Sequence, residues 1–398
     1  MNPKCYANDV YLLMADMSVK SVVNLQVGDL VMCDDSVARP ILSIEKTVEA
    51  GYQVKPIKGE SYTVGKDHTL VLRSSGHRIC TWRKTDNCFV VFWFNKDHEV
   101  VSKSYNIKSY GNDKSLTEEA ARNHYSTVEE DKGETIYDRV EDYVTKCRVW
   151  RKNYYLYSVP VTFGWQDIYI DPYILGYWLG DGHSDGPQIT TENPEVVKYF
   201  DEYAKSIGYK LVKKENTGVN IKNNSHTYRI NNPDHKSGKS DNKFLNTLRH
   251  YDLIKNKHIP LAYKYTDRSV QLAVLAGLID SDGYLNDTHY DICLVNETLR
   301  DDIVDMCLSM GYAVTTQTCQ KTCTNSSRGR VTGTYYRMYI SGNDFSDLPL
   351  LLDYKKANPK IRGVDSEIRS LKVNKLDKDV DIYKIQVDGN CMLRDFSV

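Results

Sequence analysis

The stretch LAGLIDSDGYL, residues 275–285, is an apolar run of helix length that ends in two aspartates, Asp280 and Asp282. The C-terminal end of a helix carries a partial negative charge, so carboxylates there are disfavoured unless a cation offsets them. Taken alone, the stretch also fits a helix that stops at an Asp-Gly turn. A second copy of the pattern favours the cation interpretation.

That copy is ILGYWLGDGHSDG, residues 174–186, and a helix-like segment ending in glycine follows each motif. Asp181 and Asp282 are 101 positions apart, and Gly208 and Gly311, at the ends of the following segments, are 103 apart. Two features therefore keep nearly the same spacing. This indicates a tandem structural duplication rather than one coincidence of residues.

Small residues lie one turn apart in both motif helices, at Gly176 and Gly180 in the first and at Gly277 and Ser281 in the second. Such spacing lets two helix backbones approach closely. If the helices pack side by side about a pseudo-twofold axis, the two final aspartates meet at one end.

Two carboxylates at two negative helix ends repel each other unless divalent cations lie between them. Mg²⁺ fits Asp181 and Asp282, because it takes one or two protein carboxylates and completes its shell with water and phosphate oxygens. The reaction implied is attack of a metal-activated water on a phosphodiester. Asp280 has no acidic counterpart in the first copy, where Leu179 stands, so we expect a structural role for it.

The composition is that of a globular chain: 398 residues, 41% hydrophobic and 26% charged, enough for two or three domains. The net charge of −1 shows no global basic excess, so a nucleic-acid surface must be local. No signal peptide and no apolar run of roughly 18 residues is present, and the ten cysteines are scattered. We therefore expect an intracellular, reducing compartment and no membrane association.

Both acidic motifs resemble those of the LAGLIDADG homing endonucleases. In that family the last aspartate of each motif binds the metals, which carries over to Asp181 and Asp282 as catalytic residues and metal ligands. Members with two motifs fold as a pseudo-symmetric α+β domain, αββαββα twice, whose sheets straddle a long DNA site. The resemblance implies a Mg²⁺-dependent endonuclease over residues 166–365, with repeats at about 166–260 and 261–365.

Two lysine segments resemble those that carry a lysine near the active site in this family. KNKHIP, residues 255–260, places Lys257 there, and DYKKANPK, residues 353–360, offers two adjacent lysines of which Lys356 is the better match. A lysine in this position can polarise the scissile phosphate or orient the attacking water. Either lysine is otherwise a solvated surface charge.

Local basic excess marks the segments where the family's sheets would meet DNA. Residues 210–270 hold 13 Lys and Arg against 5 Asp and Glu, and the hairpin-like segment 321–340 holds four basic residues and no acidic one. Such charges supply salt-dependent affinity for phosphates; a basic hairpin can also be a soluble edge strand. The predicted DNA contacts are Lys210, Lys213, Lys222, Arg229, Lys321, Arg328, Arg330 and Arg337.

The first ~110 residues alternate apolar and polar residues as strands do. They resemble the all-β Hint fold of inteins: a leading Cys5, the block around VGDLV, and TVGKDHTLVLR at residues 63–73 with Thr63 and His68. RVWRKNYYLYSVPV resembles the segment before the endonuclease in the yeast vacuolar ATPase intein and HO endonuclease group. The resemblance makes Cys5 the nucleophile at the Lys4–Cys5 bond, with His68 assisting the departing amide.

The C-terminal segment IYKIQVDGNCMLRDFSV resembles the last Hint strands but departs from the intein pattern. The chain ends at Val398 without the final His-Asn, and Lys384 stands where many members have an aspartate. Asn390 lies too far inside the block to serve as the terminal asparagine. The sequence is therefore either cut before its last residues or a free-standing endonuclease with a decayed Hint domain.

These observations predict a multidomain chain in which both ends, residues 1–165 and 366–398, form one Hint domain around an inserted endonuclease domain. The predicted partners of this monomer are double-stranded DNA with a long asymmetric site and, if it splices, host extein segments. DNA as substrate places it in the nucleus or another DNA-containing compartment. The alternatives are a maturase-like nucleic-acid binder without activity, and a self-processing Hint protein whose endonuclease half is passive.

Overall fold

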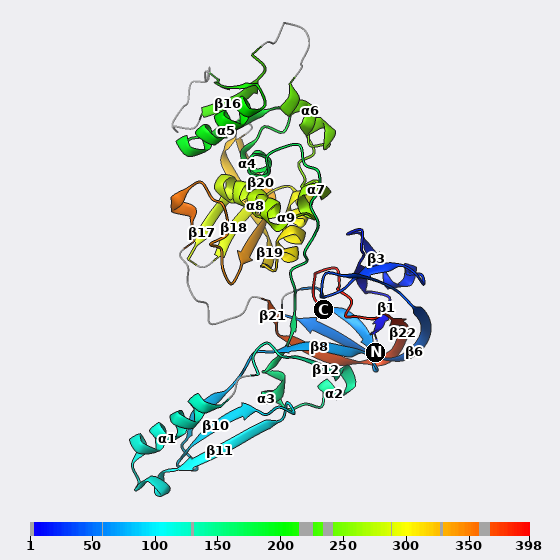
Figure 1. Cartoon of the computed structure of the whole chain (residues 1–398), viewed down its shortest axis with the longest axis vertical. Coiled ribbons are helices and arrows are strands. Elements are labelled where there is room, and N and C mark those ends of the chain that lie inside the picture. The colour runs from blue at the N-terminus through cyan, green and yellow to red at the C-terminus, as the bar shows by residue number, and fades with distance from the viewer. Residues whose placement is uncertain are drawn as a thin grey trace. The chain divides into compact units, whose positions relative to one another are not determined.

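The computed structural model describes residues 4–57, 59–128, 131–214, 226–233, 242–287, 289–326, 329–357 and 367–398. The chain divides into two compact units (Figure 1), each with its own hydrophobic core. Unit 1 consists of Met1–Val159 and Glu367–Val398, and unit 2 is Pro160–Ser366.

Unit 1 is built on a closed four-stranded barrel with the strand order β1-β22-β6-β7. β1 comes from the start of the chain and pairs antiparallel with β22 from its end, with Cys5 opposite Lys384. Both ends of the chain therefore belong to one sheet, as Figure 1 shows. The barrel strands are β1 (Lys4–Ala7), β6 (Ser43–Pro56), β7 (Tyr62–Gly65) and β22 (Leu371–Gln386).

A second sheet and two hairpins complete the body of unit 1. The sheet has the order β12-β8-β13-β21, and the hairpins pair β2 with β3 and β4 with β5. Their bounds, with those of the short helices, are β2 (Tyr11–Leu13), β3 (Val19–Ser21), η1 (Val22–Asn24), β4 (Leu30–Met32), β5 (Ala38–Pro40), β8 (Thr69–Ser74), β12 (Thr135–Arg139), α2 (Val140–Tyr143), α3 (Arg148–Arg151), β13 (Tyr154–Tyr157) and β21 (Ile368–Arg369).

A small subdomain extends from unit 1 between β8 and β12. Helix α1 packs on a three-stranded sheet of order β11-β10-β9 around its own core of Phe89, Val91, Tyr105 and Ala121. The α1 helix begins at Lys114 because Asp113 accepts hydrogen bonds from the first free amides. The elements are β9 (Ile79–Arg83), β10 (Cys88–Phe94), β11 (Val100–Asn106), η2 (Ile107–Tyr110) and α1 (Lys114–Thr127).

Unit 2 contains two successive copies of one arrangement, in which a buried helix precedes strands and a covering helix. The first copy forms a sheet of order β14-β16-β15 and the second a sheet of order β17-β18-β20-β19. The first copy comprises α4 (Pro172–Asp181), β14 (Gln188–Thr191), α5 (Pro194–Ser206), β15 (Lys210–Lys213), β16 (His226–Asn231) and α6 (Lys243–His250), followed by α7 (Leu261–Lys264). The second comprises α8 (Arg268–Asp282), β17 (Gly283–Asn286), β18 (His289–Leu294), α9 (Glu297–Ser309), β19 (Ala313–Ser326), β20 (Gly329–Ser341) and η3 (Asp353–Lys355).

The copies match at the positions on which the sequence alignment rests, with two local differences. Gly208 and Gly311 follow α5 and α9 with positive φ values of 80° and 83°, a backbone conformation that glycine adopts at little cost. In the first copy, the first strand of the expected pair is reduced to one bridge between Gly182 and Ile189. The second copy ends in the short 3₁₀ helix η3 where the expected plan has an α-helix.

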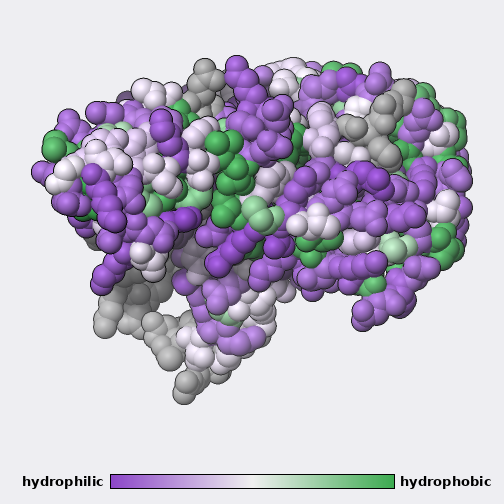
Figure 2. Space-filling view, turned by 90° about the horizontal axis from the view of Figure 1, so that it is seen from below, coloured by the Kyte–Doolittle hydropathy of each residue, from purple (hydrophilic) through white to green (hydrophobic). Residues whose placement is uncertain are grey.

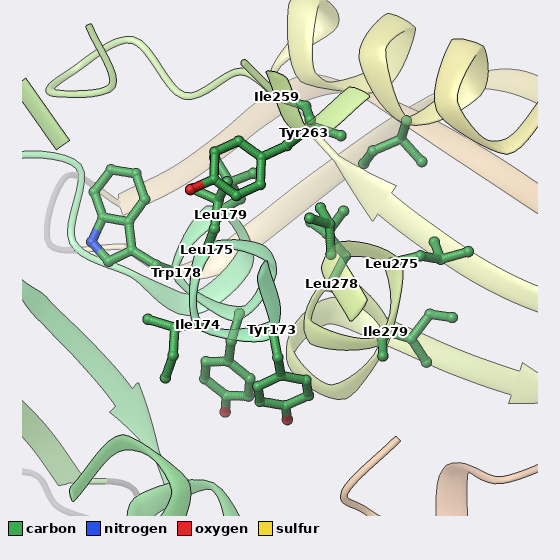
Figure 3. Packing of buried hydrophobic residues seen from close by; sticks show 14 of the residues in the cluster. Tyr173, Ile174, Leu175, Trp178, Leu179, Ile259, Tyr263, Leu275, Leu278 and Ile279 are labelled. Atoms are coloured by element: carbon green, nitrogen blue, oxygen red, sulfur yellow. The ribbon is translucent and has the colours of Figure 1, made fainter. Parts of the chain in front are cut away.

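The two motif helices α4 and α8 are in direct backbone contact, as their small residues predict. A Cβ atom at Gly176 would overlap the carbonyl oxygen of Val274, and one at Gly277 would overlap that of Tyr173. Figure 3 shows the large side chains of both helices pointing away from this contact into the surrounding core. Helix α4 begins at Pro172 because Asp171 accepts the N–H of Ile174.

The apolar residues of α4 and α8 are almost all buried, which explains why these helices lack an amphipathic pattern. On the face drawn in Figure 2, hydrophilic residues dominate and hydrophobic ones are interspersed among them. No helix of the described residues is long and apolar enough to cross a membrane.

Substituting alanine for Gly277 should destabilise unit 2 by about 2–3 kcal/mol, because the new methyl group forces two backbones apart. Urea unfolding followed by tryptophan fluorescence measures the change. Gly164→Ala is the control, since a Cβ there meets nothing within 4 Å, and should change stability by less than about 0.5 kcal/mol. Equal effects of the two substitutions would show that the helices do not touch at Gly277.

Candidate active sites

The paired helix ends in unit 2 bring Asp181 and Asp282 together. They are the last residues of α4 and α8. A Cβ atom at Gly180 would lie 3.2 Å from Asp282 Oδ2, so the Asp282 carboxylate lies against the last turn of α4. The two predicted metal ligands therefore share one site at the C-terminal ends of both helices.

The electrostatics of this site disfavour two ionised carboxylates in the absence of a cation. Burial raises the pKa of Asp181 to about 6, and the negative charge of Asp282 adds to the increase. Burial also raises the pKa of Asp282, although this side chain keeps an exposed edge. Lys257 and Lys355 oppose both shifts. A bound cation would offset the burial cost of the two carboxylates and the repulsion between them.

Lys257 binds the C-terminal end of α4. Its Nζ donates hydrogen bonds to the carbonyl oxygens of Leu179 and Gly180, both at 3.0 Å, and of Gly182 at 2.7 Å. These oxygens belong to the set that a helix C-terminus leaves without internal partners. Burial lowers the pKa of Lys257 to about 8, while the two aspartates oppose the change. The lysine therefore stays largely charged at pH 7.

Lys355 occupies the equivalent position at the end of α8. Its Nζ donates to the carbonyl oxygens of Ile279 at 2.8 Å and Asp280 at 2.9 Å, with Ser281 at 3.4 Å. Burial lowers the pKa of Lys355, and the site's carboxylates oppose that shift.

The structure places Lys355, and not the predicted Lys356, at the end of α8. Lys356 Nζ lies 2.7 Å from Asp353 Oδ1 in a surface ion pair, because successive side chains leave the 3₁₀ turn η3 in different directions.

Asp280 is buried behind the site. It accepts hydrogen bonds from the hydroxyl of Tyr173 on α4 and the backbone N–H of Leu351, both at 2.8 Å. Burial raises the pKa of Asp280. The carboxylate thus ties both motif helices to the loop that leads to Lys355, which agrees with the structural role we expected.

The donor set fits a hard divalent cation with a mostly water and phosphate shell. Among the described residues, no three His, Cys, Asp or Glu side chains gather into a cluster. A cation at the helix ends would therefore have two carboxylate side chains as protein ligands and would complete its shell with water or phosphate oxygens.

The predicted DNA contacts lie on the strands of both sheets where the structure describes them. Lys210 and Lys213 are exposed on β15, and Arg229 lies on the neighbouring strand β16. In the second copy, Lys321 on β19 lies 5.2 Å from the ring of Tyr335. Arg337 on β20 lies 3.3 Å from Asp291, which offsets part of its charge.

Three of the predicted contacts have no described side chain. Lys222 and Arg328 lie outside the described residues, and Arg330 is part of β20 but only its backbone is described.

A second constellation surrounds Cys5 in the barrel of unit 1. The backbone N–H of Cys5 donates to His68 Nδ1 at 3.1 Å. Burial lowers the pKa of His68 well below its usual value, so the ring is neutral and carries its proton on Nε2. The histidine predicted to assist the departing amide therefore contacts the nitrogen of the Lys4–Cys5 bond.

The thiol of Cys5 is buried and protonated. Burial raises its pKa to about 12, and the charge of Glu49 adds to the increase while Lys384 opposes it. A thiol attacks as its thiolate, so this cysteine needs a base.

Thr63 and Lys4 have other partners near this bond. Thr63 Oγ1 donates to Asp9 Oδ2 at 2.8 Å, and Thr63 N lies 3.3 Å from Asp9 Oδ1. The structure therefore directs the Thr63 hydroxyl to Asp9. Buried Lys4 donates from Nζ to Asn390 Oδ1 at 3.2 Å.

Comparison with known families identifies both parts. Residues 5–151 match the family model "Hom_end-associated Hint", and residues 258–350 match the family model "Homing endonuclease". The chain therefore carries a Hint domain of the kind associated with homing endonucleases, followed by a homing endonuclease domain. These two matches confirm the prediction of an intein-type Hint domain joined to a homing endonuclease domain.

Individual relatives are more distant. The replicative DNA helicase DnaB of Mycobacterium intracellulare is 27% identical over 167 residues, which are 42% of this chain and 22% of that protein. The chain thus spans about a fifth of that relative. Among solved structures, mesophilic variants of the homing endonuclease I-DmoI align with 43% of this chain and 82% of theirs, at 15% identity and a TM-score of 0.28. I-DmoI in complex with DNA and Ca aligns over the same shares, at 14% identity and a TM-score of 0.29.

The sequence reasoning missed three residues that the structure places at these sites: Lys355, Asp9 and Glu49. The sequence did indicate a lysine in the segment that contains Lys355, but it favoured the adjacent Lys356. Asp9 and Glu49 carry no signal in a single sequence, because their roles depend on strand pairing between distant segments.

Replacing Asp282 with asparagine should lower the pKa of Asp181 from about 6 toward its usual range, because a neighbouring negative charge is removed. Replacing Lys355 with methionine should raise that pKa, since a stabilising positive charge is lost. Carboxyl ¹³C NMR titration of metal-free protein with labelled aspartate measures both. If neither substitution changed the pKa of Asp181, then Asp282 and Lys355 would not be its neighbours.

Proposed function

We propose that unit 2 is a site-specific endonuclease that hydrolyses both strands of double-stranded DNA at a long, asymmetric site, using Mg²⁺. The observation that carries the proposal is the meeting of Asp181 and Asp282 at two helix ends in contact. One acidic helix end from each repeat supports one hydrolytic centre for each DNA strand. The presence of both carboxylates favours cleavage over a purely binding, maturase-like function.

Asp181 and Asp282 would hold the cation, and their ionisation sets the pH range of activity. Because the pKa of Asp181 is about 6, a fall of pH through 6 protonates this ligand and opposes metal binding, whereas at pH 7 and above it is mostly ionised. Bound Mg²⁺ would supply an activated water and stabilise the leaving oxygen.

The two lysines would act through position and charge. Lys257 already donates to three carbonyl oxygens, which uses all three of its N–H groups. It therefore fixes the end of α4 and the direction of Asp181, and it adds a positive charge beside the scissile phosphate. Lys355 does the same for α8 and Asp282.

The two sheets supply the DNA-binding surface in this proposal. The exposed basic residues Lys210 and Lys213 of β15 and Lys321 of β19 support phosphate contacts. Because the two repeats differ in sequence, they would read different half-sites, which gives an asymmetric target. Because one chain holds both repeats, we propose that it acts as a monomer.

Lys355→Met should slow DNA cleavage about 100-fold, because the end of α8 loses its bound positive charge. Lys356→Met should change the rate less than about twofold, since Lys356 is paired at the surface with Asp353. The substrate is the site recovered by cleaving a randomised DNA library with Mg²⁺ and sequencing the ends, and linearisation of a plasmid with that site gives the rate.

Asp181→Asn and Asp282→Asn serve as inactive references in this assay. A larger loss with Lys356→Met than with Lys355→Met would contradict the assignment. Plasmid cleavage that continues in both asparagine variants would contradict the proposed active site as a whole.

A second function is supported in unit 1. We propose that the Hint domain is formed by both chain ends around the inserted endonuclease, and that Cys5 attacks the carbonyl carbon of Lys4 in an N-to-S acyl shift. The hydrogen bond from Cys5 N to His68 Nδ1 carries this proposal, and the pairing of β1 with β22 supports the shared domain. Host segments joined to the chain would be its partners.

We further propose a reducing, DNA-containing compartment such as the nucleus. Two points support it: the proposed substrate of unit 2 is DNA, and every cysteine whose side chain the structure describes is a free thiol.

Dithiothreitol should cleave the Lys4–Cys5 bond in a full chain extended upstream of Lys4, because the thiol captures the thioester that Cys5 forms. Cys5→Ala should abolish release of the upstream segment, and His68→Ala should slow it at least about 100-fold through loss of the acid–base group. Gel electrophoresis over time measures release. An intact bond in the unsubstituted chain, or equal release from Cys5→Ala, would rule out this activity.

A further inference from the structure

The strand pairing beside Cys5 places a lysine next to the proposed nucleophile. Cys5 on β1 lies directly opposite Lys384 on β22. Residues opposite each other in an antiparallel pair have neighbouring side chains on one face of the sheet. A lysine at this position cannot take the proton of a thiol while it is itself protonated.

Lys384 instead connects the site to two carboxylates. Its Nζ lies 3.1 Å from Glu49 Oε2 and 3.3 Å from Asp67 Oδ2. Only 9% of the Glu49 side chain is exposed, against 32% for Asp67. Asp67 is also paired with Arg139 at 2.7 Å, which leaves it less available as a base.

Glu49 keeps one carboxylate oxygen without a partner. Among the described residues nothing donates a hydrogen bond to Glu49 Oε1, although this atom is buried. Leaving a buried carboxyl oxygen unpaired costs free energy, so the position of Glu49 Oε1 calls for an explanation.

The free oxygen lies beside the apolar cluster that contains Cys5. A Cβ atom at Gly65 would collide with Glu49 Oε1 and lie 3.1 Å from a methyl group of Ile382. Ile382 packs with Cys5 and Ala7 in one buried cluster. Glu49 Oε1 therefore lies close to Ile382, which packs with Cys5, and the missing side chain at Gly65 leaves room for this oxygen.

We propose that Glu49 is the catalytic base that removes the thiol proton of Cys5, with Lys384 holding its other oxygen in place. This inference rests on the proposed acyl shift at Lys4–Cys5. The carboxylate that activates the cysteine comes from β6, the strand that pairs with β22.

The step balances without any oxidant or co-reactant. The Cys5 proton moves to Glu49, and the thiolate attacks the Lys4 carbonyl carbon, so a carbon–sulfur bond forms. The carbon–nitrogen bond to Cys5 then breaks, and the proton that Glu49 received passes to the nitrogen, whose own N–H is held by His68 Nδ1. The net change is the transfer of one proton from sulfur to nitrogen, after which Glu49 is again ionised.

The test uses the full chain extended upstream of Lys4 and measures release of the upstream segment by dithiothreitol between pH 6.5 and 9.5. Glu49→Gln removes the base and keeps the shape of the side chain. Glu45→Gln is the matched control, because Glu45 lies on the same strand opposite Lys384 and is exposed.

At pH 7, Glu49→Gln should release the segment at least about 100-fold more slowly, and Glu45→Gln within about twofold of the unsubstituted rate. The rate of Glu49→Gln should then rise about tenfold for each pH unit, since hydroxide in solution must now form the thiolate. A structural role would give a loss that is the same at every pH.

A rate for Glu49→Gln equal to that of Glu45→Gln would overturn the proposal, and so would a slower rate with an unchanged pH profile. If the unsubstituted chain releases nothing, the acyl shift itself fails and Glu49 has no reaction to serve. Release from the unsubstituted chain together with an unaffected Glu49→Gln variant would leave the acyl shift standing and exclude only the base.

Discussion

The backbone contact between α4 and α8 is the constraint on which unit 2 depends. Glycines at 176 and 277 allow carbonyl oxygens of one helix to lie where a side chain of the other would stand. This contact places both helix C-termini side by side, so the last residue of each helix points into one shared space. The acidic site thus follows from a packing requirement, and no separate element is needed to bring Asp181 and Asp282 together.

The same contact creates an electrostatic problem that the fold solves in part. Two helix ends with unpaired carbonyl groups and two carboxylates concentrate negative charge. Lys257 and Lys355 each bind the last carbonyl oxygens of one helix and lower the pKa values of the aspartates. The pKa of Asp181 nevertheless stays near 6, which leaves a site that still favours a divalent cation. In unit 1, burial and the negative charge of Glu49 raise the pKa of the Cys5 thiol. Lys384, which is paired with Glu49, opposes this increase.

The sequence was informative where a pattern repeats and uninformative where distant strands meet. The duplicated motif and its small residues predicted the helix contact and the paired aspartates, because their spacing alone determines a helix face. The sequence could not show which of the two adjacent lysines contacts the end of α8. That depends on the turn η3, which directs Lys355 to the helix and Lys356 to Asp353 at the surface. The contacts of Thr63 with Asp9 and of Glu49 with Lys384 could not be predicted from the sequence. Each pair is distant in the chain and meets only when the barrel has folded.

The central claim is that Asp181 and Asp282 share divalent cations. Anomalous X-ray scattering from crystals of the protein–DNA complex soaked in Mn²⁺ tests it most directly. Anomalous peaks are expected within coordination distance of both carboxylates, between the ends of α4 and α8. Peaks elsewhere in the complex, with none at this pair of aspartates, would contradict it.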